Sequence, residues 1–225
     1  MIAKRPFPAH HLGYTRNPFG RLTDAEWAAV AVLPDAVRQA LPVGCHHLQL
    51  LGPRGVGKSS ALCRIVAELR QAGRRVAYEY VPPGQHHFKT DLADVEVFCL
   101  DEAQRLSWRQ RRRLVRWGGA HGRLIFSSHR DLRRWFGWQR PFVISIDLQP
   151  LVTEAHWQAV LARRLAAFAR PETPRLALAP DAVRYLHARF GADLRAGEAL
   201  LYEVWQAAEG VRTLRAEDLQ AALRP

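Results

Sequence analysis

The spacing of hydrophobic positions along the chain changes near residue 150. Before that point, short apolar runs alternate with stretches in which apolar residues recur every three to four positions. The apolar runs predict strands at residues 46–51, 75–80, 95–100, 123–127 and 142–146. Helices are predicted at residues 61–69, 107–117 and 131–136. Because strands separated by helices pair in parallel through crossover connections, this region predicts an α/β fold with a mostly parallel five-stranded sheet.

Beyond Pro150 the pattern is helical throughout. Amphipathic helices are predicted at residues 154–169, 180–190, 194–208 and 216–223. The first 45 residues differ again, because prolines interrupt any long element there and a single short helix is predicted at 24–32. We therefore expect three parts: a lead-in at 1–45, an α/β domain at 46–150 and a small all-helical lid domain at 151–225.

Composition narrows the class of protein. With 225 residues, 48% of them hydrophobic, the chain can bury a substantial core and is expected to be globular. It has neither an apolar stretch of 18 residues nor a signal-peptide core, so we expect no membrane span and a cytoplasmic location. Cys45, Cys63 and Cys99 lack C-x-x-C spacing, which favours reduced thiols. The His46-His47 and His86-His87 pairs have no third ligand at metal spacing, so no structural metal is assigned.

Residues 52–59 match the phosphate-binding pattern G-x-x-x-x-G-K-[ST] without interruption. The match follows a predicted strand and opens a predicted helix, where backbone N–H groups and the helix N-terminus favour a polyphosphate. Lys58 would reach the β- and γ-phosphates, and the Ser59 hydroxyl would hold Mg²⁺. We expect ATP and Mg²⁺ as cofactors. The expected nucleotide contacts in this segment are Gly52, Pro53, Arg54, Gly55, Val56, Gly57, Lys58, Ser59 and Ser60.

Two acids end the predicted strand at 95–100. Ligands bind at the carboxyl ends of parallel strands, which is where Asp101 and Glu102 would lie. Asp101 would complete the Mg²⁺ site, and Glu102 would polarise a water for attack on the γ-phosphate. The alternative interpretation of this pair is an acidic helix N-cap.

Polar residues also end the next predicted strand. The segment Ser127-Ser128-His129 would lie between the acid-bearing strand and the phosphate loop, where one side chain could orient water or contact the γ-phosphate. Ser128 is the first choice, Ser127 the second, and His129 a further alternative. A serine-rich helix cap before Asp131 would explain the same residues without a catalytic role.

Together these segments resemble AAA+ ATPases. The resemblance is carried by the phosphate loop, the Asp-Glu-Ala-Gln sequence at 101–104, the Ser-Ser strand end and the four-helix tail. Residues 144–151, followed by Arg163-Arg164-Leu165, and residues 14–19 look most like a bacterial branch that contains transposon target-selection and secretion-associated ATPases. The resemblance implies ATP hydrolysis, a homo-oligomer in the ATP state, and a position near the adenine for Pro18 and Phe19.

The resemblance also implies roles for two arginines. Arg140, just before the last predicted strand, matches the usual place of an arginine finger that reaches a neighbouring subunit's γ-phosphate. Arg133 and Arg134 are alternatives in the same arginine-rich segment. Arg195 matches the lid arginine that senses the nucleotide. For each of them, a solvated surface arginine is the simpler interpretation.

The formal charge of +12 suggests a polyanionic partner, chiefly DNA. The densest local cluster lies on the predicted helix 107–117, which Gly118-Gly119 should end, and is flanked by Trp108 and Trp117. Its arginines are Arg109, Arg111, Arg112, Arg113 and Arg116. A solvated helix face is the alternative explanation.

These features favour an ATP-driven oligomeric switch that acts with DNA, in a role such as transposition, replication or defence. A P-loop small-molecule or nucleotide kinase is the alternative. A further alternative is an ATP-binding adaptor that acts through protein partners. A protein partner could also supply specificity, because no separate recognition domain is evident in the sequence.

Overall fold

The computed structural model describes residues 9–42 and 46–223, apart from the side chains of residues 9 and 138–141. The chain divides into two compact units. One unit, Asp24–Leu151, contains the sheet. The other combines the segment up to Thr23 with the chain from Val152 onward. Each unit is described by itself.

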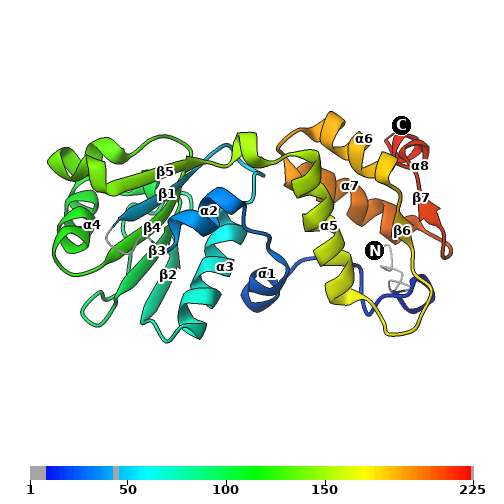
Figure 1. The fold of residues 1–225 in the computed structure, drawn as a ribbon, viewed down its shortest axis with the longest axis horizontal. Helices are drawn as coiled ribbons and strands as arrows, with labels where there is room; N and C mark the ends of the chain where they lie inside the picture. Colours follow the sequence, from blue (N-terminus) through cyan, green and yellow to red (C-terminus); the bar gives the residue numbers. More distant parts are fainter. Residues whose placement is uncertain (1–8, 43–45, 224–225) are drawn as a thin grey trace. The chain divides into compact units, whose positions relative to one another are not determined.

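The sheet unit has five strands, and all its strand pairs are parallel, in the order β2-β3-β4-β1-β5 (Figure 1). The strands are β1 (His47–Leu51), β2 (Val76–Tyr80), β3 (Val97–Asp101), β4 (Arg123–Ser128) and β5 (Val143–Asp147). The helices are α1 (Asp24–Val30), α2 (Asp35–Ala40), α3 (Lys58–Gln71) and α4 (Trp108–Ala120), with 3₁₀ turns η2 (Ala103–Arg105), η3 (Arg133–Phe142) and η4 (Gln149–Leu151). This arrangement confirms the predicted α/β P-loop NTPase fold.

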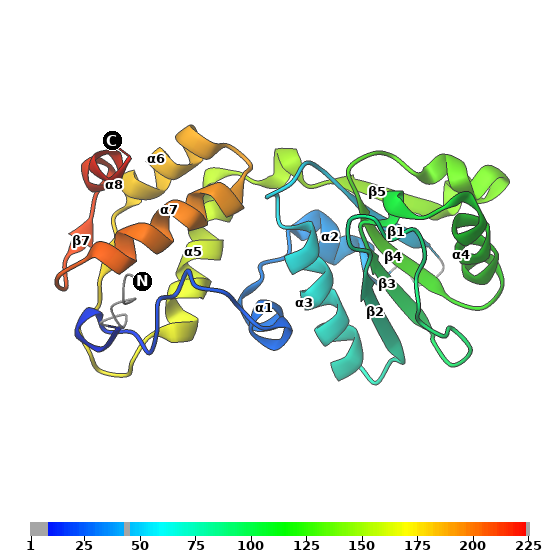
Figure 2. The same ribbon diagram turned by 180° about the vertical axis from the view of Figure 1, so that it is seen from behind.

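Hydrophobic residues on both faces of the central strands hold this unit together. Every residue of β3 is buried, as expected for a parallel strand covered on both sides. Helix α3 packs on β2, β3 and β4. Helix α4 packs through Leu114 and Trp117 against Phe98 and Phe126 of the sheet, and Figure 2 shows the two helices on either side of it. The carboxyl ends of β1, β3 and β4 are thereby fixed at one edge.

The second unit consists mainly of helices α5 (Glu154–Phe168), α6 (Pro180–Phe190), α7 (Leu194–Ala207) and α8 (Ala216–Ala222). Trp157 and Trp205 are completely buried in it. A Cβ atom at Gly197 would lie 2.3 Å from the Trp157 ring, so this glycine permits close packing around the indole. Two short parallel strands, β6 (Ala177–Leu178) and β7 (Thr213–Leu214), were not predicted.

The lead-in does not form a part of its own. Its beginning, with the 3₁₀ turn η1 (Ala9–Leu12), belongs to the helical unit, where the Tyr14 hydroxyl donates a hydrogen bond to the Leu176 carbonyl at 2.6 Å. Its end carries α1, which packs on α3. The prolines in this segment correctly predicted that its elements are short. They could not show to which unit each element belongs, because that depends on tertiary packing.

Two local predictions were wrong. Helix α2 was not predicted, and α4 does not end at Gly118-Gly119 but continues to Ala120. A Cβ atom at position 118 would lie 2.8 Å from Leu124 Cδ1, so this glycine permits close packing of helix on strand. Within the described ranges, no helix combines the length and the apolar character that a membrane crossing requires.

Candidate nucleotide-binding site

The phosphate loop connects β1 to α3 and follows the backbone path that its glycines permit. Gly52, Gly55 and Gly57 have φ values of 137°, 89° and 88°, which residues with a side chain rarely adopt. Gly57 is the N-cap of α3. A Cβ atom at Gly52 would lie 2.9 Å from Val56 Cγ2. The sequence therefore forms a curled loop at the start of a 14-residue helix, a shape that fits an anion.

Lys58 is held inside this loop. Its side chain is only 6% exposed, and Nζ donates hydrogen bonds to the carbonyls of Gly52 at 2.8 Å and Pro53 at 2.7 Å. These carbonyls accept the ammonium hydrogen bonds that phosphate oxygens would accept in a nucleotide complex. Next to it, Ser59 is exposed. The loop residues therefore fit a polyphosphate.

Asp101 ends β3 and is 1% exposed. The Ser127 hydroxyl, on neighbouring β4, donates a hydrogen bond to its carboxylate and accepts one from the Glu102 N–H at 2.9 Å. The Tyr78 hydroxyl lies 3.5 Å from the other carboxylate oxygen, and burial followed by the Asp101 charge raises the pKa of Tyr78 well above its usual value. Carboxylate and hydroxyl oxygens are the ligands that Mg²⁺ prefers, so Asp101 and Ser59 fit the predicted metal role.

Glu102 has an unusual backbone and a crowded carboxylate. Its φ of 64° is left-handed, a conformation that is unfavourable for residues other than glycine by about 1 kcal/mol and is concentrated at functional sites. The carboxylate pairs with Arg105 at 3.0 Å and accepts a hydrogen bond from Gln104 Nε2 at 2.7 Å. The turn η2 therefore supplies two groups that fix this carboxylate.

His129 links the acid to the phosphate loop. Its Nε2 lies 3.1 Å from Glu102 Oε1, while Nδ1 lies 3.1 Å from the Gly52 carbonyl oxygen and 3.5 Å from Lys58 Nζ. Ser128, the first-choice polar residue, instead donates its hydroxyl to the Arg130 carbonyl and is fully buried. The structure thus places the third alternative, which directly follows β4, at the loop.

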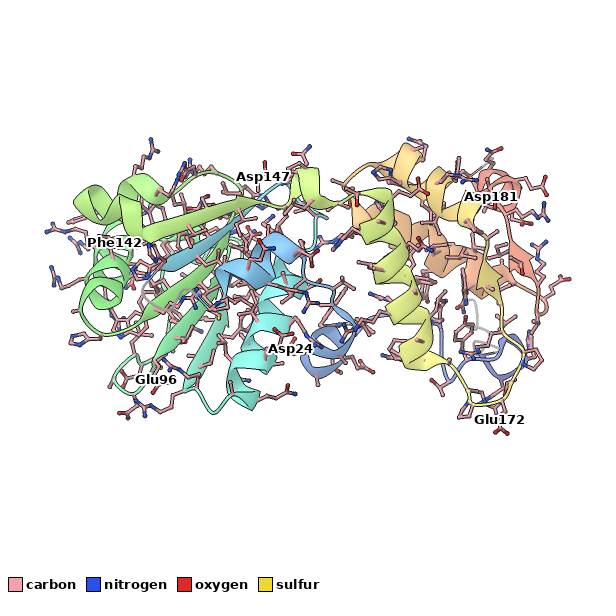
Figure 3. The ribbon with its side chains drawn as sticks, viewed as in Figure 1. Asp24, Glu96, Phe142, Asp147, Glu172 and Asp181 are labelled. Carbon is pink, nitrogen blue, oxygen red and sulfur yellow. The ribbon has the colours of Figure 1, made fainter. Side chains whose placement is uncertain are left out.

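An open cleft of about 660 Å³ lies at this edge of the sheet. Asp147, which lies at the carboxyl end of β5 (Figure 3), also lines the cleft, and its Oδ1 accepts a hydrogen bond from the Gln149 N–H at 2.9 Å. Both positively and negatively charged residues line the cleft. Its charged and histidine residues are Arg54, Glu102, Arg105, His129, Arg130, Asp131 and Asp147.

The candidates for the arginine finger differ in their surroundings. Arg133 forms an ion pair with Asp131 at 2.7 Å, and this partner raises the pKa of Arg133. Arg134 is exposed. Arg140 lies in η3, but its side chain is outside the described residues. Of the three, Arg133 is therefore already engaged within its own chain.

The predicted adenine contacts lie in the helical unit. Phe19 is buried edge-on against Trp205, with ring centroids 4.9 Å apart. The Pro18 carbonyl accepts a hydrogen bond from Arg164 Nε at 2.7 Å. Arg195 is exposed in the first turn of α7, where Asp193 caps the helix.

Sequence reasoning missed the role of Arg164, which is 3% exposed. Its NH1 pairs with Glu198 at 3.0 Å, and its NH2 donates to the Gly20 carbonyl at 3.0 Å. The side chain therefore clamps the Pro18–Gly20 segment to α5 and α7. Only the resemblance at 163–165 drew attention to this position, and it indicated no partner.

No protein-family model and no curated protein sequence matches the chain. Solved structures do match it. The RuvB Holliday junction branch migration motor of Thermotoga maritima aligns over 85% of this chain and 69% of its own, with a TM-score of 0.60 and 14% identity. Orc1 of Aeropyrum pernix, solved in complex with DNA, aligns over 87% and 68% with a TM-score of 0.58 and 17% identity.

NtrX of Brucella abortus, solved with ADP, aligns over 87% of this chain and 56% of its own, with a TM-score of 0.51 and 15% identity. All three neighbours are AAA+ ATPases. At these identities the likeness concerns the fold. The chain therefore has an α/β P-loop NTPase fold whose similar structures are AAA+ ATPases.

Proposed function

We propose that this protein is a Mg²⁺-dependent ATPase of the AAA+ type. The supporting observation is the link from Lys58 through His129 to Glu102, which joins the phosphate loop to an acid beside buried Asp101. Structural binding of a nucleotide would not require a carboxylate fixed in this position. A general base held near the loop is what hydrolysis requires.

Bound Mg²⁺-ATP would supply the reacting phosphoryl group. Lys58 would exchange the Gly52 and Pro53 carbonyls for phosphate oxygens, and Ser59 and Asp101 would hold the metal. Glu102 would orient a water and accept its proton. Ser127 fixes Asp101, and His129 would hold Glu102 in position.

We further propose that the helical unit acts as a lid, with Arg195, Pro18 and Phe19 contributing to the adenine side. Arg140 or Arg134 would act on a neighbouring subunit in a homo-oligomer. The sequence resemblance of residues 14–19, 144–151 and 163–165 supports a place in the branch of transposon target-selection and secretion-associated ATPases. A cytoplasmic location fits that branch. The oligomer, the branch and the location belong to the proposal.

DNA is the proposed partner. The charge of +12 supports a polyanion, and two of the similar structures are a Holliday junction branch migration motor and a protein solved with DNA. Hydrolysis would then change the assembly or its hold on DNA. A role in transposition, replication or defence agrees with this activity.

Release of phosphate from ATP by the purified protein, without any acceptor molecule, tests the enzyme. Glu102→Gln should retain ATP binding while turnover falls by about 100-fold or more. Adding duplex DNA at low and moderate salt tests the partner, and stimulation should fade as salt rises. Unchanged turnover in Glu102→Gln would contradict the role of Glu102, and turnover that requires a phosphoryl acceptor would indicate a kinase.

A further inference from the structure

Helix α4 presents one continuous cationic face. Arg109, Arg112, Arg113 and Arg116, here called the α4 arginine face, are all exposed. At 3.6 residues per turn they lie within about 100° of arc on the helix. The helix contains no acidic residue, and no salt bridge to these four side chains occurs within the described part of the chain. The face therefore holds four like charges without compensation.

The remaining arginine of the predicted cluster lies elsewhere. Arg111 is half-buried, its Nε donates to the Leu106 carbonyl at 2.7 Å, and its guanidinium lies 4.4 Å from the Trp135 ring centroid. Burial, followed by the charges of Arg130 and Arg134, lowers its pKa. Arg111 anchors the helix, and we exclude it from the arginine face.

An exposed tryptophan lies beside the arginines. Trp108, in the first turn of α4, is 60% exposed. The guanidinium carbons of Arg109 and Arg112 lie 5.6 Å and 5.9 Å from its ring centroid. The Trp108 indole is therefore not part of the hydrophobic core. With two guanidinium groups beside it, it offers a surface on which a nucleobase can stack.

The other end of the face borders a hollow of about 490 Å³. Arg113 and Arg116 line it together with Trp117, His121 and residues 91–93, of which Asp91 is the acidic member. The Trp117 Nε1 donates to the Leu92 carbonyl at 3.1 Å, so the floor of the hollow is fixed. Two guanidinium groups at this recess supply the planar forks of N–H donors with which arginine binds phosphate oxygens.

We propose that the α4 arginine face binds the phosphate backbone of DNA and that Trp108 stacks on an accessible base. The inference rests on the proposed partner and assigns it a surface. A protein partner would need an apolar centre at its interface, whereas Trp108 is the only large hydrophobic side chain exposed on the described part of α4. Four uncompensated guanidinium groups match a polyphosphate, whose counterions they would release.

The test compares two double variants that remove the same charge. Arg112→Gln with Arg116→Gln alters the face, and Arg184→Gln with Arg189→Gln removes two exposed arginines of α6. Fluorescence anisotropy gives Kd for labelled single-stranded and duplex DNA across a salt series. The α4 pair should weaken binding about tenfold or more and lower the salt slope by about 1.4 to 1.8, and the α6 pair should change Kd by less than about threefold. Thermal unfolding of each variant controls for folding.

Each outcome decides a separate point. Equal weakening by both pairs, or none from the α4 pair, would overturn the surface while leaving DNA as partner. If the wild-type protein binds neither single-stranded nor duplex DNA, the proposals that DNA is the partner and that the α4 arginine face binds it are both overturned. The proposed ATPase activity is tested separately by phosphate release. Trp108→Ala should weaken single-stranded DNA more than duplex, and an equal effect on both would overturn the stacking role.

Discussion

His129 Nε2 and Glu102 Oε1 lie 3.1 Å apart at the carboxyl edge of the sheet. The two residues directly follow the neighbouring strands β3 and β4, and the imidazole also contacts the phosphate loop through Nδ1. A carboxylate partner at Nε2 favours a proton on that nitrogen. Glu102 therefore takes its orientation from a group that also contacts Lys58, so that a change in the phosphate loop can alter the position of the acid.

We expect His129→Ala to lower kcat by up to about 100-fold, because Glu102 would lose its link to the loop. The affinity for ATP should change little, since Lys58 and the loop amides remain. Steady-state phosphate release, with nucleotide affinity measured separately, distinguishes the two effects. His129→Gln should recover part of the rate, because its amide can donate to Glu102. Loss of ATP affinity without loss of kcat would contradict a positioning role.

Lys58→Ala should weaken ATP binding by about 10- to 100-fold, because a hydrogen bond to a charged group contributes about 1.5–3 kcal/mol. Lys58 is held by the Gly52 and Pro53 carbonyls, so its removal also leaves those carbonyls without this donor. Isothermal titration with a non-hydrolysable ATP analogue measures the change. Lys89→Ala, at an exposed position outside the loop, is the matched control and should bind normally.

The phosphate loop could be predicted from sequence because its chemistry is local. Eight consecutive residues specify the curled backbone, and Asp101 and Glu102 follow directly from the end of a strand. The polar residue at the carboxyl end of β4 that reaches the loop could not be selected in the same way. Ser127, Ser128 and His129 are consecutive, and which of them reaches the loop depends on how β4 pairs with β1 and β3.

Two other features depend on packing between distant segments. In the sequence Arg111 lies among other arginines and cannot be distinguished from them. It differs from them in the fold because its guanidinium contacts the Leu106 carbonyl and the Trp135 ring. Arg164 contacts a segment about 145 positions earlier in the chain. Hydrophobic periodicity places both residues on helices but contains no information about these partners.

Arg164→Ala should destabilise the helical unit by about 3–5 kcal/mol, because it leaves Glu198 buried without its partner. Burial raises the pKa of Glu198 and the Arg164 charge opposes that shift, so removing the arginine should favour the protonated acid. Chemical denaturation measures the loss. Arg184→Ala on α6 is exposed and should cost less than about 0.5 kcal/mol. Equal effects of the two variants would show that the clamp is not stabilising.

The buried His47 predicts how stability changes with pH. Burial, then the charges of Arg123 and His46, lowers its pKa from 6.5 to about 4, and its Nδ1 accepts a hydrogen bond from the Leu124 N–H at 3.1 Å. The unfolded chain therefore binds a proton between pH 6.5 and 4 that the folded protein does not. Stability is complete above pH 6.5 and falls as the pH decreases through this window.

From pH 7.5 to pH 5 the loss attributable to His47 is about 2 kcal/mol. Urea denaturation at the two pH values measures it. His47→Asn keeps a hydrogen-bond acceptor for Leu124 without a titrating group, so this variant should lose about 2 kcal/mol less than the wild-type protein on acidification. His121→Asn, at an exposed position, controls for the removal of any histidine. If His47→Asn and the wild-type protein respond to pH alike, the folded protein does not hold His47 in its neutral form.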